Sequence, residues 1–196
     1  MRRMTTELRP WDESDAESLQ HAFAVSDDLV TQVGDVDLST LDRCREFIAL
    51  QLGPSSPAVH NFAISVDGAA VGNVGIGNME HRHDTGWVYY WVSTEARGQG
   101  LASRALASAA QWAFQQRGLF RLELGHRVNN PASCIVATNA GFVAEGIERQ
   151  KLKYGQTRFD VETHARLETD PVLEIKLMNI VRRGGDSDVV SDVRRH

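Results

Sequence analysis

The sequence predicts an α+β fold in which helices flank a mixed, mostly antiparallel central sheet. Three features support this prediction: residues 60–66 alternate in polarity, residues 67–68 signal a hairpin, and an unbroken helical pattern follows Gly100. The chain has 196 residues, of which 42% are hydrophobic and 24% charged. Length and composition are those of one globular domain with a sizeable core.

Turn and capping signals divide the chain into strand, two helices, three strands, helix, strand, helix and two strands. The strand at 86–92 is apolar on both faces, so we expect it at the centre of the sheet. The expected ranges are a strand at 5–8, helices at 12–30 and 40–52, strands at 59–66, 69–79 and 86–92, a helix from 101, a strand at 120–125, a helix at 131–140, and strands at 142–153 and 157–167.

The C-terminal part is expected to add a helix and a tail to a domain that spans residues 1–168. In residues 169–183, Leu173, Leu177, Ile180 and Val181 fall on one helical face, whereas Ile175 does not. That face could pack on its own domain or on a second copy of the chain, which would make a homodimer. Residues 184–196 are polar, and we expect a disordered tail.

Composition argues against several kinds of partner. The net charge is −5 and a basic footprint is missing, which disfavours nucleic acid. No apolar run approaches the roughly 20 residues that span a membrane, and the N-terminus lacks a secretory pattern. Cys44 and Cys134 are too few for a disulfide framework or a metal cage, and His81 and His83 lack an evident third ligand. We therefore expect a cytoplasmic protein without a bound metal.

A glycine-containing loop, Arg-Gly-Gln-Gly-Leu-Ala at 97–102, connects the central strand to the long helix. Unpaired N–H groups and the positive end of the helix dipole gather at such a helix start, and glycine lets the backbone approach a ligand. The loop lacks both the Gly-Lys-Ser/Thr of a nucleoside-triphosphate loop and the third glycine of a dinucleotide fingerprint. It therefore predicts a different phosphate site, the alternative being a plain turn; the glycine run at 72–77 is interpreted as a strand.

The pattern Arg-x-x-Gly-x-Ala, formed by Arg97, Gly100 and Ala102, resembles the pyrophosphate-binding motif of the GNAT superfamily of N-acetyltransferases. The segments NPASCIVATNAGFVAEG at 130–146 and GQTRFDVETHARL at 155–167 resemble the RimJ/RimL type, the ribosomal-protein N-acetyltransferases and their relatives. The resemblance covers roughly residues 5–168. It implies the GNAT fold, acetyl-CoA as the donor and an amine as the acceptor.

The resemblance also implies how the donor is held. Backbone amides of residues 97–102 would bind the pyrophosphate, and the pantetheine arm would run between the strands at 86–92 and 120–125, which splay apart in relatives. Asn130 matches an asparagine that binds this arm, although it equally fits a helix N-cap before Pro131. The implied cofactor-binding residues are Trp91, Val92, Arg97, Gly98, Gln99, Gly100, Leu101, Ala102, Asn130 and Ser133.

Two catalytic residues are implied in the same way. Ser133 stands where relatives carry a serine near the thioester sulfur, and its hydroxyl could donate to the departing thiolate; the alternative is a serine that satisfies its own helix end. Glu123 matches a strand glutamate that serves as the base in some relatives, whereas Leu152 occupies the position of the base in others and cannot serve. Further candidates for the base, each interpretable as surface charge, are Glu80, His81, His83 and His126.

The acceptor is inferred from amine chemistry. An α-amine has a pKa near 8 and a lysine amine about 10.4, so the neutral fraction at pH 7 is on the order of a few hundred times larger for an N-terminus. A site without an obvious base therefore suits a protein N-terminus, with water as proton carrier. Alternatives are a small-molecule amine and a non-catalytic acetyl-CoA-binding module. Trp87, Tyr89 and Trp91 share one strand face, as core or as acceptor groove, and Cys134 is interpreted as a buried small residue.

Overall fold

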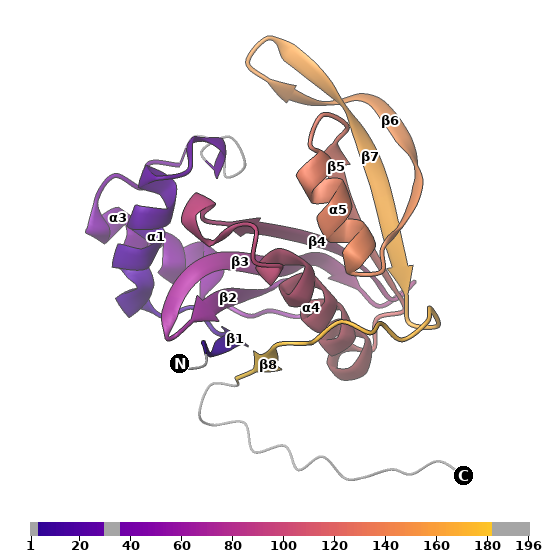
Figure 1. Ribbon diagram of the computed structural model, residues 1–196, viewed down its shortest axis with the longest axis horizontal. Coiled ribbons are helices and arrows are strands. Elements are labelled where there is room, and N and C mark those ends of the chain that lie inside the picture. Colours follow the sequence, from indigo (N-terminus) through magenta and orange to yellow (C-terminus); the bar gives the residue numbers. More distant parts are fainter. Residues whose placement is uncertain (1–3, 30–35, 182–196) are drawn as a thin grey trace.

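One eight-stranded sheet, in the order β6-β7-β5-β4-β3-β2-β1-β8, organises the chain (Figure 1). The structure is a computed structural model that describes residues 4–29 and 36–181. All neighbouring strands are antiparallel except β4 with β5 and β1 with β8. The predicted mixed, mostly antiparallel sheet is therefore confirmed, and the strand expected at its centre, β4 (Thr85–Val92), lies there.

The predicted order of elements up to residue 167 is confirmed, and apart from the first helix their ends move by only a few residues. The remaining elements are β1 (Thr6–Arg9), the short helices η1 (Glu13–Asp15) and η3 (Thr94–Ala96), α1 (Ala16–Ala24), α3 (Leu41–Phe47) continued by the π-helical turn η2 (Ile48–Leu52), β2 (His60–Val66), β3 (Ala69–Glu80), α4 (Leu101–Arg117), β5 (Arg121–Arg127), α5 (Pro131–Asn139), β6 (Val143–Tyr154), β7 (Thr157–Leu167) and β8 (Asn179–Ile180).

The single helix expected at 12–30 is wrong, because α1 ends at Ala24 and residues 27–29 belong to a new helical segment. Ser26 separates the two. Its hydroxyl accepts the N–H of Thr94 at 2.9 Å, and its carbonyl accepts the N–H of Leu29 at 3.0 Å. A serine that bonds in this way begins a new turn rather than continuing the old one. The end of the expected helix lies outside the described residues.

Two apolar clusters cover the two faces of the sheet. The larger one joins α4 and α5 to the sheet, and within it Ala105 and Ala109 are fully buried, so α4 lies close to the strands as its small residues predict. The smaller one joins α1 and α3 to the opposite face. Alternation along β2 divides its side chains between them: Phe62 belongs to the first cluster and Ala63 to the second.

The amphipathic helix expected at 169–183 is wrong for its described part. Residues 171–181 are extended, cross α4 and end in β8, which pairs in parallel with β1. Side chains of α4 satisfy this backbone: Ser108 Oγ accepts the N–H of Met178 at 2.8 Å, and Arg104 Nε donates to the carbonyl of Lys176 at 2.9 Å. Ile175, which falls off the helical face, packs against the larger cluster, whereas Leu177 is 39% exposed. The segment thus packs on its own domain, and the expected tail lies outside the described residues.

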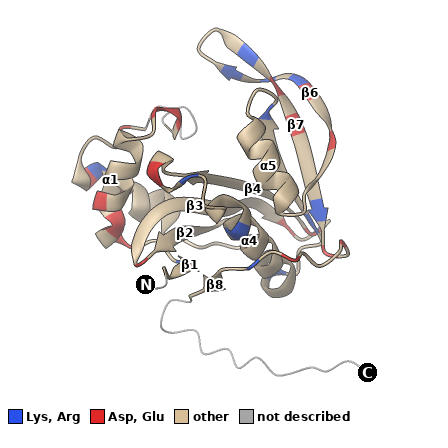
Figure 2. Cartoon of the chain, viewed as in Figure 1, with Lys and Arg blue, Asp and Glu red and all other residues tan. Residues whose placement is uncertain are grey.

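Basic and acidic residues are interspersed along β6 and β7, whereas acidic residues gather around α1 (Figure 2). Among the described residues, no helix is both long enough and apolar enough to cross a membrane. The glycines at 72–77 lie in β3, as interpreted from the sequence. A Cβ on Gly72 would stand 2.5 Å from the carbonyl oxygen of Trp91, so that run serves close strand packing.

Candidate active site

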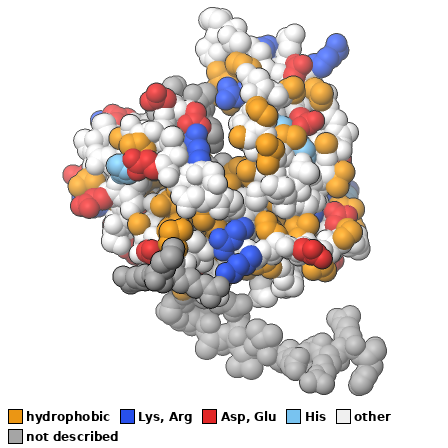
Figure 3. Space-filling view, in the orientation of Figure 1, with side chains coloured by type: hydrophobic (Ala, Val, Ile, Leu, Met, Phe, Trp, Pro, Cys, Tyr) orange, Lys and Arg blue, Asp and Glu red, His pale blue; other side chains and the backbone are white. Residues whose placement is uncertain are grey.

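The central feature of the site is a gap between two parallel strands. β4 and β5 pair only at Thr85–Trp87 with Arg121–Glu123, and β4 then runs on to Val92 without this partner. A cavity of about 670 Å³ is lined by the separated parts of both strands, residues 88–92 and 124–127. The surface is hollowed between the α1 side of the molecule and the side formed by α5, β6 and β7 (Figure 3). The splay expected between these two strands is therefore present.

The glycine loop lines the same cavity. Gly98 and Gly100 have φ values of 76° and 70°, which favour glycine, and a Cβ on either would meet nothing within 4 Å. Gly100 is the N-cap of α4 without a side-chain cap bond, and the backbone bond from Arg104 N to Gly100 O (3.2 Å) begins the helix. The N–H groups of residues 101–103 precede that bond, so they can bind an anion.

Arg97 is already engaged by protein groups. Its Nη2 donates to both carboxylate oxygens of Asp28 at 2.9 Å, and its Nε donates to the carbonyl of Val92 at 2.9 Å. The side chain therefore ties the loop to the end of β4 and to residues 27–29. Val92 lines the cavity, but its carbonyl is occupied by Arg97, and Gln99 is not among the lining residues. The loop's capacity for phosphate rests on backbone N–H groups.

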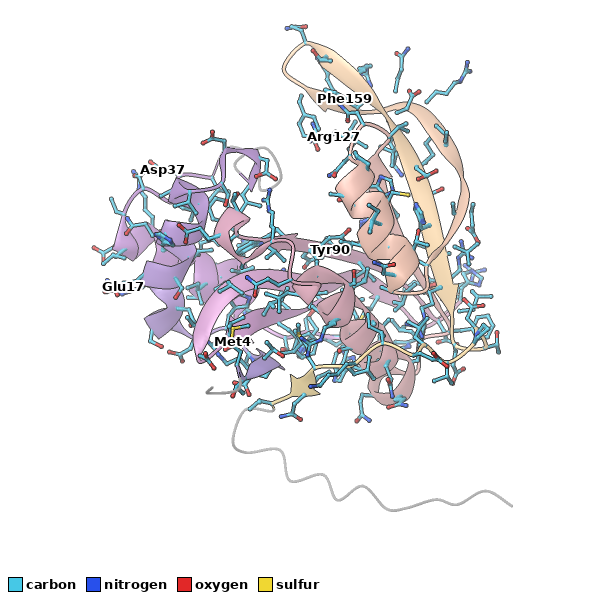
Figure 4. All side chains as sticks on the ribbon, viewed as in Figure 1. Met4, Glu17, Asp37, Tyr90, Arg127 and Phe159 are labelled. Atoms are coloured by element: carbon cyan, nitrogen blue, oxygen red, sulfur yellow. The ribbon has the colours of Figure 1, made fainter. Side chains whose placement is uncertain are left out.

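Ser133 is positioned at the cavity wall by the first turn of α5. Asn130 Oδ1 accepts the N–H of Ser133 at 3.2 Å, so the N-cap role of Asn130 is present, and both residues line the cavity. Tyr90 reaches from β4 toward α5 (Figure 4), and its hydroxyl donates to the carbonyl of Ser133 at 3.3 Å. Burial raises the pKa of Tyr90, which keeps this donor protonated.

Residues 6–143 match the acetyltransferase (GNAT) domain family. The chain belongs to this family. A ribosomal-protein-serine acetyltransferase of Escherichia coli is 30% identical over 106 residues, which are 54% of this chain and 59% of that protein. The chain thus spans somewhat more than half the length of this relative.

Two solved structures share the GNAT fold with this chain. Mycobacterium smegmatis RimJ in complex with CoA-disulfide has a TM-score of 0.71 at 23% identity, covering 83% of this chain and 82% of its own. RimL, a ribosomal L7/L12 alpha-N-protein acetyltransferase in complex with coenzyme A, has a TM-score of 0.70 at 24% identity, covering 83% of this chain and 94% of its own. The expected GNAT fold is confirmed.

Glu123 does not line the cavity of this GNAT domain. It lies on β5, and Arg121 Nε donates to its Oε1 at 2.6 Å. Arg121 also holds Glu145 of β6 through both terminal nitrogens. Side chains alternate along β5, so Glu123 projects from the face opposite to the buried Leu122 and Leu124. The structure therefore does not bring Glu123 and Ser133 together.

The other candidate bases are divided between two places. Glu80, at the end of β3, accepts the backbone N–H groups of Arg82 and His83 in the turn at 81–84 and the hydroxyl of Thr85, the first residue of β4. His81 and His83 lie in the same turn. Burial would raise the pKa of Glu80, but these hydrogen bonds outweigh it and lower the pKa. His126, by contrast, lines the cavity and is 8% exposed.

The aromatic residues of β4 were interpreted from the sequence either as core or as an acceptor groove, and the structure shows residues of both kinds. Trp91 is 7% exposed and packs edge-on against Phe23 in the smaller cluster, so it is a core residue that also borders the cavity. Trp87 and Tyr89 line the cavity wall, and Lys151 Nζ lies 5.1 Å from the ring centroid of Trp87. Sequence reasoning missed Lys151, because its contact with Trp87 joins two strands, β6 and β4, that are not neighbours in the sheet.

Proposed function

We propose that this protein transfers the acetyl group of acetyl-CoA to the N-terminal α-amine of a protein. The observation that carries the proposal is the cavity between β4 and β5, which is lined both by the glycine loop and by Ser133. The name of the Escherichia coli relative supports the same acceptor class. A cytoplasmic location is part of the proposal, because Cys44 and Cys134 are not joined in a disulfide, as is usual for cysteines in reducing compartments.

In this proposal the donor follows the open edge of β4. The pyrophosphate accepts hydrogen bonds from backbone N–H groups at the start of α4, where the helix dipole favours an anion. The pantetheine arm occupies the gap that opens beyond Trp87, where β4 lacks β5 as its partner. This course leads the thioester toward Ser133 on the opposite wall.

The reaction is direct transfer between two bound substrates. The neutral amine nitrogen attacks the thioester carbonyl carbon, a C–N bond forms, and the C–S bond breaks as the tetrahedral intermediate collapses. Ser133 Oγ gives its proton to the departing sulfur, which leaves as a thiol, and Ser133 regains the proton that the amine loses, carried to it by water. A fixed base is not needed if the amine arrives neutral.

The charges of the cavity favour an N-terminal amine over a polycationic small molecule. Among the described lining residues, the strongly acidic or basic ones are Asp28, Arg97, Arg127 and Lys151. The one carboxylate among them is already paired with Arg97. A polyamine would need several carboxylates to offset its charge, whereas a single α-amine can enter in its neutral form.

The test is thiol release from acetyl-CoA with two matched peptides. One peptide has a free N-terminus and no lysine, and the other has a blocked N-terminus and one lysine. We expect turnover with the first peptide only. Turnover with the lysine peptide alone would contradict the acceptor assignment, and binding of acetyl-CoA without transfer to either peptide or to small amines would indicate a non-catalytic binding module.

Gly100→Glu tests the donor site. A carboxylate at this position would face the pyrophosphate, and like charges in contact cost several kcal/mol, so we expect acetyl-CoA affinity to fall about 100-fold. Gly118→Glu is a matched control, because Gly118 caps the other end of α4 with φ of 65° and equally open surroundings. Equal affinity in the two variants would contradict the pyrophosphate assignment.

A further inference from the structure

Four side chains with metal-binding atoms converge beneath α5. His126 comes from β5, Cys134 from α5, and Glu162 and His164 from β7. One ligand atom of each lies within 4.8 Å of all the others. His126 and His164 are 8% and 2% exposed, so both imidazoles are shielded from bulk water. The β5–β7 register sets His126 directly opposite Glu162 and places His164 two residues further along the same face.

The two imidazoles present the same nitrogen to one point. His126 Nδ1 contacts the carbonyl of Arg127 at 3.1 Å, and His164 Nδ1 contacts the carbonyl of Phe142 at 3.4 Å. A carbonyl only accepts, so each Nδ1 carries a proton, and each Nε2 of a neutral imidazole then presents a lone pair. The two Nε2 atoms are 3.0 Å apart, and Glu162 Oε2 lies 3.1 and 3.3 Å from them. With both imidazoles neutral, three lone-pair atoms face one another, an arrangement that a bound cation would satisfy.

From this geometry we infer that His126, Cys134, Glu162 and His164 bind one zinc ion. A tetrahedral zinc site with ligand bonds of about 2.0–2.1 Å has edges of about 3.3 Å between its nitrogen and oxygen ligands. The three measured edges, 3.0, 3.1 and 3.3 Å, form nearly such a face. Cys134 Sγ supplies the fourth ligand as a thiolate after losing its proton to water, and the carbonyls behind both Nδ1 atoms orient the rings as at protein zinc sites.

The ligand set identifies the metal and its role. Imidazole with thiolate suits zinc and excludes magnesium and calcium, which prefer oxygen ligands. Four protein ligands complete the coordination sphere, so the site is structural rather than catalytic. It would tie α5 to β5 and β7 at Cys134, the residue next to Ser133, and so hold the wall of the donor cavity in place. This inference differs from the expectation of a metal-free protein drawn from the sequence, and the zinc content of the purified chain tests the two against each other.

The experiment uses the full chain without a histidine tag. We expect about one zinc per purified chain by elemental analysis. Adding zinc to chelated protein should raise Tm by about 5–15 °C at concentrations 100- to 1,000-fold above Kd. Cobalt substitution should give the thiolate charge-transfer absorption and intense visible bands of a tetrahedral site. These readouts do not depend on acetyl transfer, so they stand or fall independently of the proposed function.

Two variants and two matched controls decide the ligands. Cys134→Ser should remove the charge-transfer absorption and His164→Gln should abolish the zinc-dependent rise in Tm, while Cys44→Ser and His81→Gln should leave both unchanged. Circular dichroism of each chelated variant checks folding, and the near-isosteric Cys134→Ser keeps the test decisive if His164→Gln does not fold. Zinc-free protein whose Tm ignores added zinc, or zinc binding that survives both ligand substitutions, would overturn the inference.

Discussion

Ser133 is held by two contacts that leave its hydroxyl free to act. Its backbone N–H bonds to Asn130 and its carbonyl to Tyr90, so replacing the side chain disturbs neither contact. We expect Ser133→Ala to lower kcat about 100-fold, the scale of a lost proton donor, with little change in acetyl-CoA affinity. Ser55→Ala, which removes an exposed hydroxyl outside the cavity lining, should leave kcat unchanged. A proportional loss of affinity and kcat in Ser133→Ala would instead indicate a binding role.

Substitution of Glu123, unlike that of Ser133, is expected to leave kcat close to that of the wild type. A general base contributes about 100-fold or more to a rate, so Glu123→Gln should cost at least that much if this residue abstracts the amine proton. Because Glu123 is paired with Arg121 outside the cavity, we expect kcat and its pH profile to stay close to wild type. Glu145→Gln, which removes the other carboxylate held by Arg121, is the matched control. A large loss confined to Glu123→Gln would restore it as the base.

Strands β5 and β6 are linked at one end by a charged cluster. Arg121 hydrogen-bonds Glu145, which lowers the pKa of that carboxyl. A lowered folded-state pKa adds stability that is present above the unfolded value, near 4.3, and is lost as pH falls through the folded value. The side chains are 28% and 46% exposed, so solvent screening limits the effect to about 0.5–1 kcal/mol. Arg121→Gln should therefore lower the free energy of unfolding by this amount at pH 7 and by much less near pH 3.

Urea denaturation of wild type and variant at the two pH values measures this difference. Arg149→Gln makes the same charge change at an exposed position of β6 and should have little effect at either pH. A loss in Arg121→Gln that is equal at pH 7 and pH 3 would mean that the arginine stabilises through the packing of its stem rather than through Glu145.

At the scale of the whole molecule, local signals were enough to predict most elements. The hairpin at 67–68 and the start of α4 at Gly100 depend on residues adjacent in sequence, and both positions have the backbone conformations that their glycines favour. The cavity between β4 and β5 was predicted only through the family resemblance. The sequence signals for it are the glycine loop at 97–102 and the pair Asn130 and Ser133. Positions that depend on neighbouring residues could therefore be predicted.

Features that depend on long-range register could not be predicted. His126 and His164 are 38 positions apart, and nothing in the sequence shows that β5 and β7 pair so as to bring them together. The position of Glu123 outside the cavity could not be predicted either, because the direction in which its side chain points depends on the strands that pair with β5. The apolar periodicity of residues 171–181 predicted a helix, but these residues are extended. Side chains of α4 form hydrogen bonds with their backbone groups, which in a helix would bond to one another.

The extended C-terminal segment makes a prediction that separates it from a helix. Met178 is 5% exposed in the larger cluster, and its N–H bonds to Ser108, whereas Leu177 is 39% exposed and Val172 is 95% exposed. We expect Met178→Ala to lower the free energy of unfolding by about 2–3 kcal/mol, because it leaves a cavity in the larger cluster. Val172→Ala should change it by less than about 0.5 kcal/mol.

Leu177→Ala decides between the two conformations by denaturant unfolding. A helix over these residues would place Leu177 on the apolar face with Leu173, so its loss would cost more than the loss of Met178. In the extended segment the order reverses, because Met178 points into the core and Leu177 outward. A larger loss for Leu177→Ala than for Met178→Ala would contradict the strand. A larger loss for Met178→Ala would mean that this segment completes the core of the domain. The stability of the domain would then depend on residues that follow the expected GNAT region at 1–168.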